Sequence, residues 1–268
     1  MINWSLFKED IRQNFTIFLI VLGVLIMYLL VIINMYSPTD MQGFEQILKM
    51  KMSADVLKAF GFVLPEEMSL TKFISSYFYG LLIYMFPLIY TVVVANRVLA
   101  GLVGSGSMAF LLTSPSKRTT IAFTQGLFLL TSTWLLIIIL MFSGMAFCSV
   151  AFPNMLDINA FFCLNIGACL LFTIITGIGF LASAIFNDPK HSLMVGIGLP
   201  VLFLLLNMLV NVSDKLNVLR YFTILTLYDA EAIVKGIGYG TDFIIMGTGG
   251  IILYTIAIMA FNKRDLPV

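Results

Sequence analysis

The sequence has few charged residues, and this scarcity excludes an ordinary soluble domain. Only 11% of the 268 residues are charged and 60% are hydrophobic, whereas soluble domains carry about 25% charged residues. The net charge of +1 gives no reason to expect a nucleic acid partner or an acidic substrate. We therefore expect an all-α polytopic membrane protein in which residues 1–268 form a single transmembrane domain.

Cysteine and histidine are also scarce, which argues against disulfide and metal chemistry. The three cysteines, Cys148, Cys163 and Cys169, lie in or beside apolar runs and form no CxxC pair, so they are best explained as small buried side chains. The single histidine, His191, lies in a polar turn and lacks the convergent partners that a base or a metal ligand needs. The sequence therefore predicts no catalytic residue, no metal site and no cofactor-binding site in this chain.

The motifs of nucleotide hydrolysis and of ion-coupled transport are missing as well. The stretch Gly104-Ser105-Gly106-Ser107 resembles a phosphate loop only superficially, because no lysine follows its last glycine to reach a phosphate. The apolar runs hold almost no charged residue, whereas proton- or ion-coupled carriers usually keep some inside the bilayer. The chain must draw energy from elsewhere or act passively.

Long apolar runs are abundant, and six of them can cross about 30 Å of hydrocarbon. An amphipathic helix over residues 1–14 comes first, with Trp4, Phe7 and Ile11 on its apolar face. This pattern is typical of a helix that lies in the membrane interface. Short helices are expected in the connectors 37–72 and 213–241. The predicted spans are residues 15–35, 73–95, 120–147, 158–186, 193–212 and 243–261.

The distribution of lysine and arginine favours cytoplasmic termini. With that orientation, the inside segments hold eight cationic and four acidic residues, whereas the outside connectors hold seven and ten. The inside cations are concentrated in short segments at span ends, where the positive-inside rule applies best. The connectors 37–72 and 213–241 are then extracellular.

The connector of residues 97–118 is the most informative stretch. It carries Arg97, Lys117 and Arg118 and no acidic residue, and the apolar patch 108–112 lies within it. Such a stretch is typical of a helix that docks into a partner's groove or lies along the membrane. The alternative is a solvated loop with a short surface helix. The candidate contact residues are Arg97, Met108, Phe110, Leu111, Leu112, Ser114, Pro115, Lys117 and Arg118.

This order of elements, with the run Leu111-Leu112-Thr113-Ser114-Pro115-Ser116-Lys117-Arg118, resembles the permeases of the ABC-type-2 family, also called type V exporters. The glycine-serine stretch before this run is similar to the family's coupling segment. Val103 stands about where the family often has an acidic residue.

The resemblance implies several further expectations. Residues 97–118 would be a cytoplasmic coupling helix on a separate ABC ATPase, which would bind ATP and Mg. Two permeases, either identical copies or paralogues, would form the working unit in a bacterial plasma membrane. The abundance of phenylalanine and methionine (24 and 16 residues) suits an amphipathic or hydrophobic substrate. Exporters of cytolytic peptides such as phenol-soluble modulins are the expected subgroup, and lantibiotic exporters are the second.

Two other functions remain open from the residues alone. A membrane-embedded enzyme or processing protease needs converging His, Asp or Glu residues in the spans, and the sequence suggests no such set. A passive channel or an assembly factor needs no partner ATPase.

Overall fold

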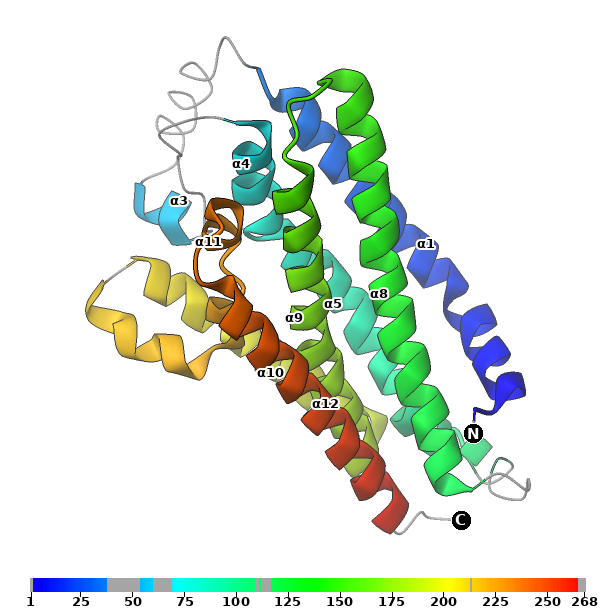
Figure 1. Ribbon diagram of the computed structural model, residues 1–268. Helices are drawn as coiled ribbons and strands as arrows, with labels where there is room; N and C mark the ends of the chain where they lie inside the picture. Colours follow the sequence, from blue (N-terminus) through cyan, green and yellow to red (C-terminus); the bar gives the residue numbers. More distant parts are fainter. Residues whose placement is uncertain are drawn as a thin grey trace.

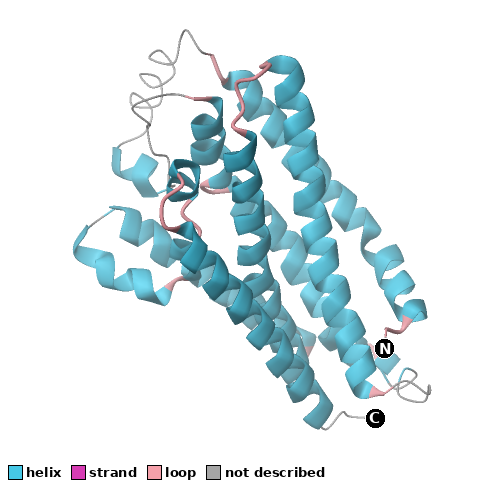
Figure 2. Ribbon diagram, in the orientation of Figure 1, coloured by secondary structure: helices cyan, strands magenta, loops and turns pink. Residues whose placement is uncertain are grey.

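The computed structural model describes residues 2–37, 54–59, 69–108, 111, 117–212 and 214–264. All regular structure in these ranges is helical (Figures 1 and 2). Six helices are long and apolar enough to span a membrane, which confirms the prediction of an all-α polytopic protein. They are α1 (Trp4–Met35), α5 with its extension (Leu82–Gly104), α8 (Arg118–Ala151), α9 (Ile158–Ile185), α10 (Pro189–Val212) and α12 (Tyr239–Lys263).

Shorter elements gather toward the end of the bundle opposite the two chain ends (Figure 1). Within the predicted connector 37–72, the described part contains α3 (Ala54–Ala59) and the start of α4 (Leu70–Ile74), which continues as the π turn η1 (Ser75–Tyr79). Between α10 and α12 lie η3 (Asp214–Phe222), η4 (Ile224–Leu227) and α11 (Ala230–Lys235).

The first helix is continuous from Trp4 to Met35, so residues 4–14 form its first turns rather than a separate element. The side chain of Asn3 caps its start by accepting a hydrogen bond from the backbone N–H of Leu6 (3.1 Å), as N-cap residues do. The predicted boundary at residues 14 and 15 is absent, because no helix-breaking residue separates the amphipathic turns from the apolar ones.

Helix α9 lies at the centre of the bundle, and α12 packs against it closely enough for backbones to approach. Small residues make this approach possible. A Cβ atom on Gly250 of α12 would lie 2.5 Å from a side-chain carbon of Thr173 of α9. Hydroxyl groups add links, because Tyr254 donates to Thr176 (2.9 Å) and Trp134 of α8 donates to Thr173 (3.0 Å). The central helix therefore connects the elements whose ends meet at the candidate site.

Candidate functional site

The candidate site is the end of the bundle that carries both termini. In Figure 1 the start of α8, the turn between α9 and α10 and the end of α12 all lie at this end. The described ends of the predicted coupling segment therefore lie at the same end of the bundle as two other parts of the chain.

The second spanning helix extends beyond its predicted end at residue 95. It continues through the π turn η2 (Arg97–Gly101) and α6 (Leu102–Gly104), and Gly106 follows with a positive φ of 74°. The first eight residues of the predicted connector are thus helical. Arg97 is accommodated because it is exposed and its guanidinium donates to the side chain of Asn14 in α1 (3.3 Å).

The π turn also joins this helix to α9. The backbone N–H of Ala100 donates to the hydroxyl of the fully buried Ser183 (2.8 Å). A π turn shifts the regular hydrogen-bond ladder by one residue and often occurs at functional sites. Here Ser183 satisfies a backbone donor from the neighbouring helix.

The predicted contact residues divide into three groups. Met108 is buried, with 3% of its surface exposed, and its side chain packs into the core of this chain, so in this structure it offers little surface to a partner. Leu111 is partly buried against the same core, Arg118 is partly buried and Lys117 is exposed. Phe110, Leu112, Ser114 and Pro115 lie outside the described residues.

The turn between α9 and α10 packs directly on the end of α6. A Cβ atom added to Gly104 would lie 2.6 Å from a ring carbon of Pro189, which is shorter than real Cβ contacts allow. Only glycine fits between these two segments without displacement. Gly104, which the sequence analysis placed only within the glycine-serine stretch of the expected coupling segment, is therefore a packing residue.

Arg264, at the end of α12, binds the end of α9. Its guanidinium donates to the backbone carbonyls of Ala184 and Phe186 (2.8 Å each) and of Ser183 (3.3 Å). It also donates to the side chain of Asn187, with an Nε–Oδ1 distance of 2.6 Å. Carbonyls at a helix end lack intrahelical partners, and a cationic side chain satisfies them well.

The sequence analysis did not predict the Arg264 contacts, because Arg264 lies beyond the last predicted span, residues 243–261. The backbone carbonyl of Arg264 in turn accepts a hydrogen bond from Arg118 (3.0 Å), at the start of α8. Burial lowers the pKa of Arg264, but arginine remains charged at neutral pH. The two arginines thus connect the end of the predicted coupling segment with the end of α9.

The single histidine of the sequence, His191, lies in the first turn of α10. Asp188 accepts hydrogen bonds from the backbone N–H of Lys190 (2.9 Å) and lies 3.2 Å from the His191 ring. The backbone hydrogen bond from Lys190, with smaller contributions from His191, lowers the pKa of Asp188. Both side chains are exposed, so His191 is a polar surface residue paired with a helix cap rather than part of a buried site.

Of the three residues on the predicted apolar face of the N-terminal turns, two are exposed and one packs against α8. Trp4 and Ile11 are exposed (64% and 45%), whereas Phe7 packs edge-on against Phe128 of α8, with ring centroids 5.6 Å apart. The exposure of Trp4 is compatible with a place at the membrane interface.

Two buried polar side chains on α1 were not predicted from the sequence. Asp10 and Asn14 are 6% and 3% exposed, and Gln125 of α8 donates its amide to the Asp10 carboxylate (3.2 Å). The i, i+4 spacing of Asp10 and Asn14 places them on one face, but the pattern in the sequence did not reveal that this face packs against α8.

Among the described residues no group of three His, Cys, Asp or Glu side chains is placed to hold a metal ion. The contacts at this end join helix ends through arginine, serine and close glycine packing.

In a comparison with protein families, one family model matches almost the whole chain. The model of the family described as ABC-2 family transporter protein matches residues 2–266. A comparison with curated proteins gives no match.

Proposed function

The chain belongs to the ABC-2 transporter family, and from this premise we propose that it is the permease subunit of an ATP-driven exporter. Members of this family form the membrane-spanning part of ABC transporters. ATP hydrolysis then occurs on a separate ATPase subunit, which binds ATP and Mg, and this chain supplies the route through the membrane.

The observation that supports this proposal best is the joining of the segment 97–118 to other helix ends. Gly104 packs on Pro189, and Arg118 donates to Arg264, so a push on this segment acts on α8, α9, α10 and α12 together. A partner docked at this end would therefore move several helices rather than a loop. Lys117 and Lys190 are exposed here and would form the rim of the contact.

The proposed complex contains two permeases and two ATPases. The second permease is either another copy of this chain or a paralogue. Closure of the ATPases would shift the equilibrium between inward-open and outward-open states. Reversing a strong bias from 1:99 to 99:1 takes about 5.5 kcal/mol, which ATP binding and hydrolysis can supply.

We further propose an amphipathic or hydrophobic substrate, such as a peptide toxin, an antimicrobial peptide or a lipid-like compound. Helix α10 supports this proposal because its exposed side chains are almost all apolar, including Met194, Leu202 and Leu205 (67%, 48% and 52%). If the second permease packs so that part of this surface borders the pathway instead of hydrocarbon, the pathway would favour apolar cargo and disfavour ions. Phenol-soluble modulins are the first candidates.

The proposed location is a bacterial plasma membrane with both termini in the cytoplasm. This orientation places the segment 97–118 on the side where ATP is available. It also places Asn154 and α11 on the extracellular side.

Purification of the tagged chain from native membranes tests the proposal. An ATPase with a phosphate loop should co-purify, and ATP hydrolysis sensitive to vanadate should accompany it. The chain purified alone should hydrolyse no ATP. If no ATPase co-purifies after mild solubilisation and cross-linking, the exporter proposal is wrong.

A further inference from the structure

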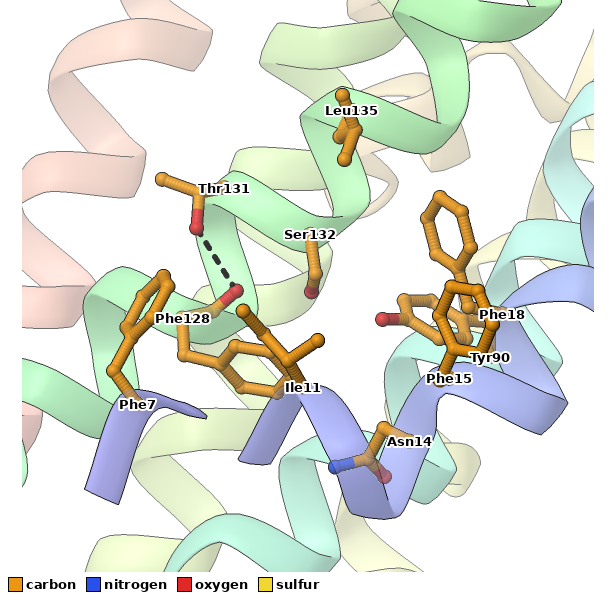
Figure 3. A pocket seen from close by; sticks show the side chains of 10 residues that line it. All are labelled: Phe7, Ile11, Asn14, Phe15, Phe18, Tyr90, Phe128, Thr131, Ser132 and Leu135. Atoms are coloured by element: carbon orange, nitrogen blue, oxygen red, sulfur yellow. Dashed lines mark hydrogen bonds between the residues drawn. The ribbon is translucent and has the colours of Figure 1, made fainter. Parts of the chain in front are cut away.

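A cavity of about 360 Å³ lies between three helices near the start of α1. Ligand pockets range from about 300 to 1,000 Å³, so the volume suits a slender guest. Figure 3 shows the side chains of α1, α5 and α8 around it. Its lining is largely aromatic and aliphatic, and includes Phe7, Ile11, Phe15, Tyr90, Phe128 and Leu135.

Three polar donors of the lining already have partners on the backbone of their own helices, and Tyr90 adds one hydroxyl, which interacts with Ser132. Thr131 donates to the carbonyl of Leu127 (2.7 Å), and Ser132 donates to the carbonyl of Leu129 (3.1 Å). The amide of Asn14 donates to the carbonyl of Asp10 (2.9 Å). Because these donors are satisfied, a polar guest would gain little here, whereas an apolar guest would fill the space without leaving a polar group unpaired.

The opening of the cavity lies among exposed apolar side chains. Ile11, Phe15 and Leu135 are 45%, 52% and 51% exposed, and they belong to helices long enough to span a membrane. Large exposed apolar side chains on such helices face hydrocarbon. The cavity is therefore accessible from the bilayer.

Cationic residues lie beside this opening. Lys8 and Arg12 are exposed on α1, each three residues before a lining residue, Ile11 or Phe15. Arg97 donates to Asn14, which lines the cavity. The exposed acid in these turns, Glu9, accepts a hydrogen bond from Gln13 (3.0 Å). The excess of positive charge complements an anionic headgroup.

We propose that this cavity holds an acyl chain of an anionic membrane lipid, with its headgroup beside Lys8 and Arg12. The lipid would fill the space between α1, α5 and α8 and fix α1 at the membrane boundary. This site is independent of the proposed cargo, because it is a lateral site for a bilayer component.

The test uses the full chain in nanodiscs that contain phosphatidylcholine and phosphatidylglycerol. In one sample the phosphatidylglycerol carries a photoreactive acyl chain, and in the other the phosphatidylcholine carries it. After irradiation, peptide mass spectrometry locates the adducts. The expected result is preferential labelling of residues 7–18 and 128–135 by phosphatidylglycerol.

Two variants of α8 test whether the labelled lipid occupies the cavity itself. Ser132→Phe places a ring in the cavity and should reduce this labelling by about tenfold or more, as expected when an apolar site is filled. Ser143→Phe is the matched control, because Ser143 is also a half-buried serine of α8 that donates to its own helix (2.8 Å to Ile139). It should leave the labelling unchanged.

A third variant tests the headgroup without altering the cavity. Replacing Lys8 and Arg12 together by glutamine should reduce the preference for phosphatidylglycerol by about tenfold, since each cation near the surface contributes substantially to attraction of anionic lipid. Undiminished labelling in Ser132→Phe, or equal labelling by the two lipids in the unaltered chain, would overturn the proposal. Cross-linking of two protein chains through the lining residues would overturn it too, by identifying a second copy as the occupant.

Discussion

Arg118, the first residue of α8, donates a hydrogen bond from Nη1 to the backbone carbonyl of Arg264 at the end of α12, at 3.0 Å. The two residues are 146 positions apart. The Arg264 guanidinium in turn holds the carbonyls that end α9. A displacement at the start of α8 can therefore reach α9 and α12 through directional contacts.

The first prediction concerns this contact. Arg264→Ala removes the charged donor from the carbonyls of Ala184 and Phe186, and hydrogen bonds to charged groups contribute about 1.5–3 kcal/mol each. We expect a loss of about 2–4 kcal/mol in stability and reduced stimulation of the ATPase by substrate. Thermal unfolding in detergent and ATPase assays of the complex measure the two effects.

The matched control for Arg264 is its neighbour. Lys263 is exposed at the last turn of α12, so Lys263→Ala should change the free energy of unfolding by no more than about 0.5 kcal/mol. If Arg264→Ala behaves like Lys263→Ala in both assays, the contact has no part in coupling.

The second prediction concerns the packing of Gly104 on Pro189. Gly104→Ala places a Cβ atom 2.6 Å from the proline ring, and overpacking of this kind costs about 1–3 kcal/mol. Transport should fall because the α9–α10 turn must shift. Gly198→Ala is the control: within the described part of the chain nothing lies within 4 Å of its Cβ, and alanine in a helix should stabilise by about 0.5–1 kcal/mol.

A third prediction tests orientation. Single cysteines replace Asn154 or Ile237 at one end and Ser107 or His191 at the other, all of which are exposed, in a chain without its native cysteines. An impermeant maleimide should label the first pair in whole cells and the second pair only after lysis. The reverse pattern would invert the topology and remove the segment 97–118 from the cytoplasm.

A fourth prediction rests on the apolar sequence pattern at residues 108–112. If Phe110 seats in the partner, Phe110→Asp should release the ATPase and abolish export, because buried apolar side chains contribute about 1.5–3 kcal/mol each and central anchors dominate interfaces. Lys117→Ala should leave assembly largely intact, since single exposed ion pairs contribute about 0–1 kcal/mol. Pull-down of the tagged variants with detection of the ATPase decides between these outcomes, and full retention by Phe110→Asp would contradict the docking assignment.

The sequence predicts six long apolar helices, which the structure contains, because hydrophobic length is a local property. The end of the second span was harder to predict, since Arg97 suggested the end of hydrocarbon. The helix continues because Asn14 and Ser183, which are distant in sequence, supply partners for the Arg97 side chain and the Ala100 backbone. Such partners are determined by tertiary structure.

At the candidate site, too, local properties could be predicted from the sequence but tertiary contacts could not. The charge and apolar pattern of residues 97–118 indicated a contact region, but amphipathic spacing does not reveal which neighbour covers a side chain, and Met108 is covered by the protein itself. The contacts of Arg264 could not be predicted from the sequence, because its acceptors are backbone carbonyls of another helix. Backbone acceptors leave no signature in a sequence.

Site-specific photo-cross-linking tests the central claim most directly. A photoreactive amino acid is placed at Ser107 or Lys117, both exposed, and in separate chains at Asn154 or Ile237 as controls at the opposite end. After irradiation of intact membranes, we expect the first two positions to form adducts with an ATPase that contains a phosphate loop, and the control positions to form none. Adducts with such an ATPase at Asn154 or Ile237, or none at Ser107 and Lys117, would contradict the assignment of residues 97–118 as the coupling segment.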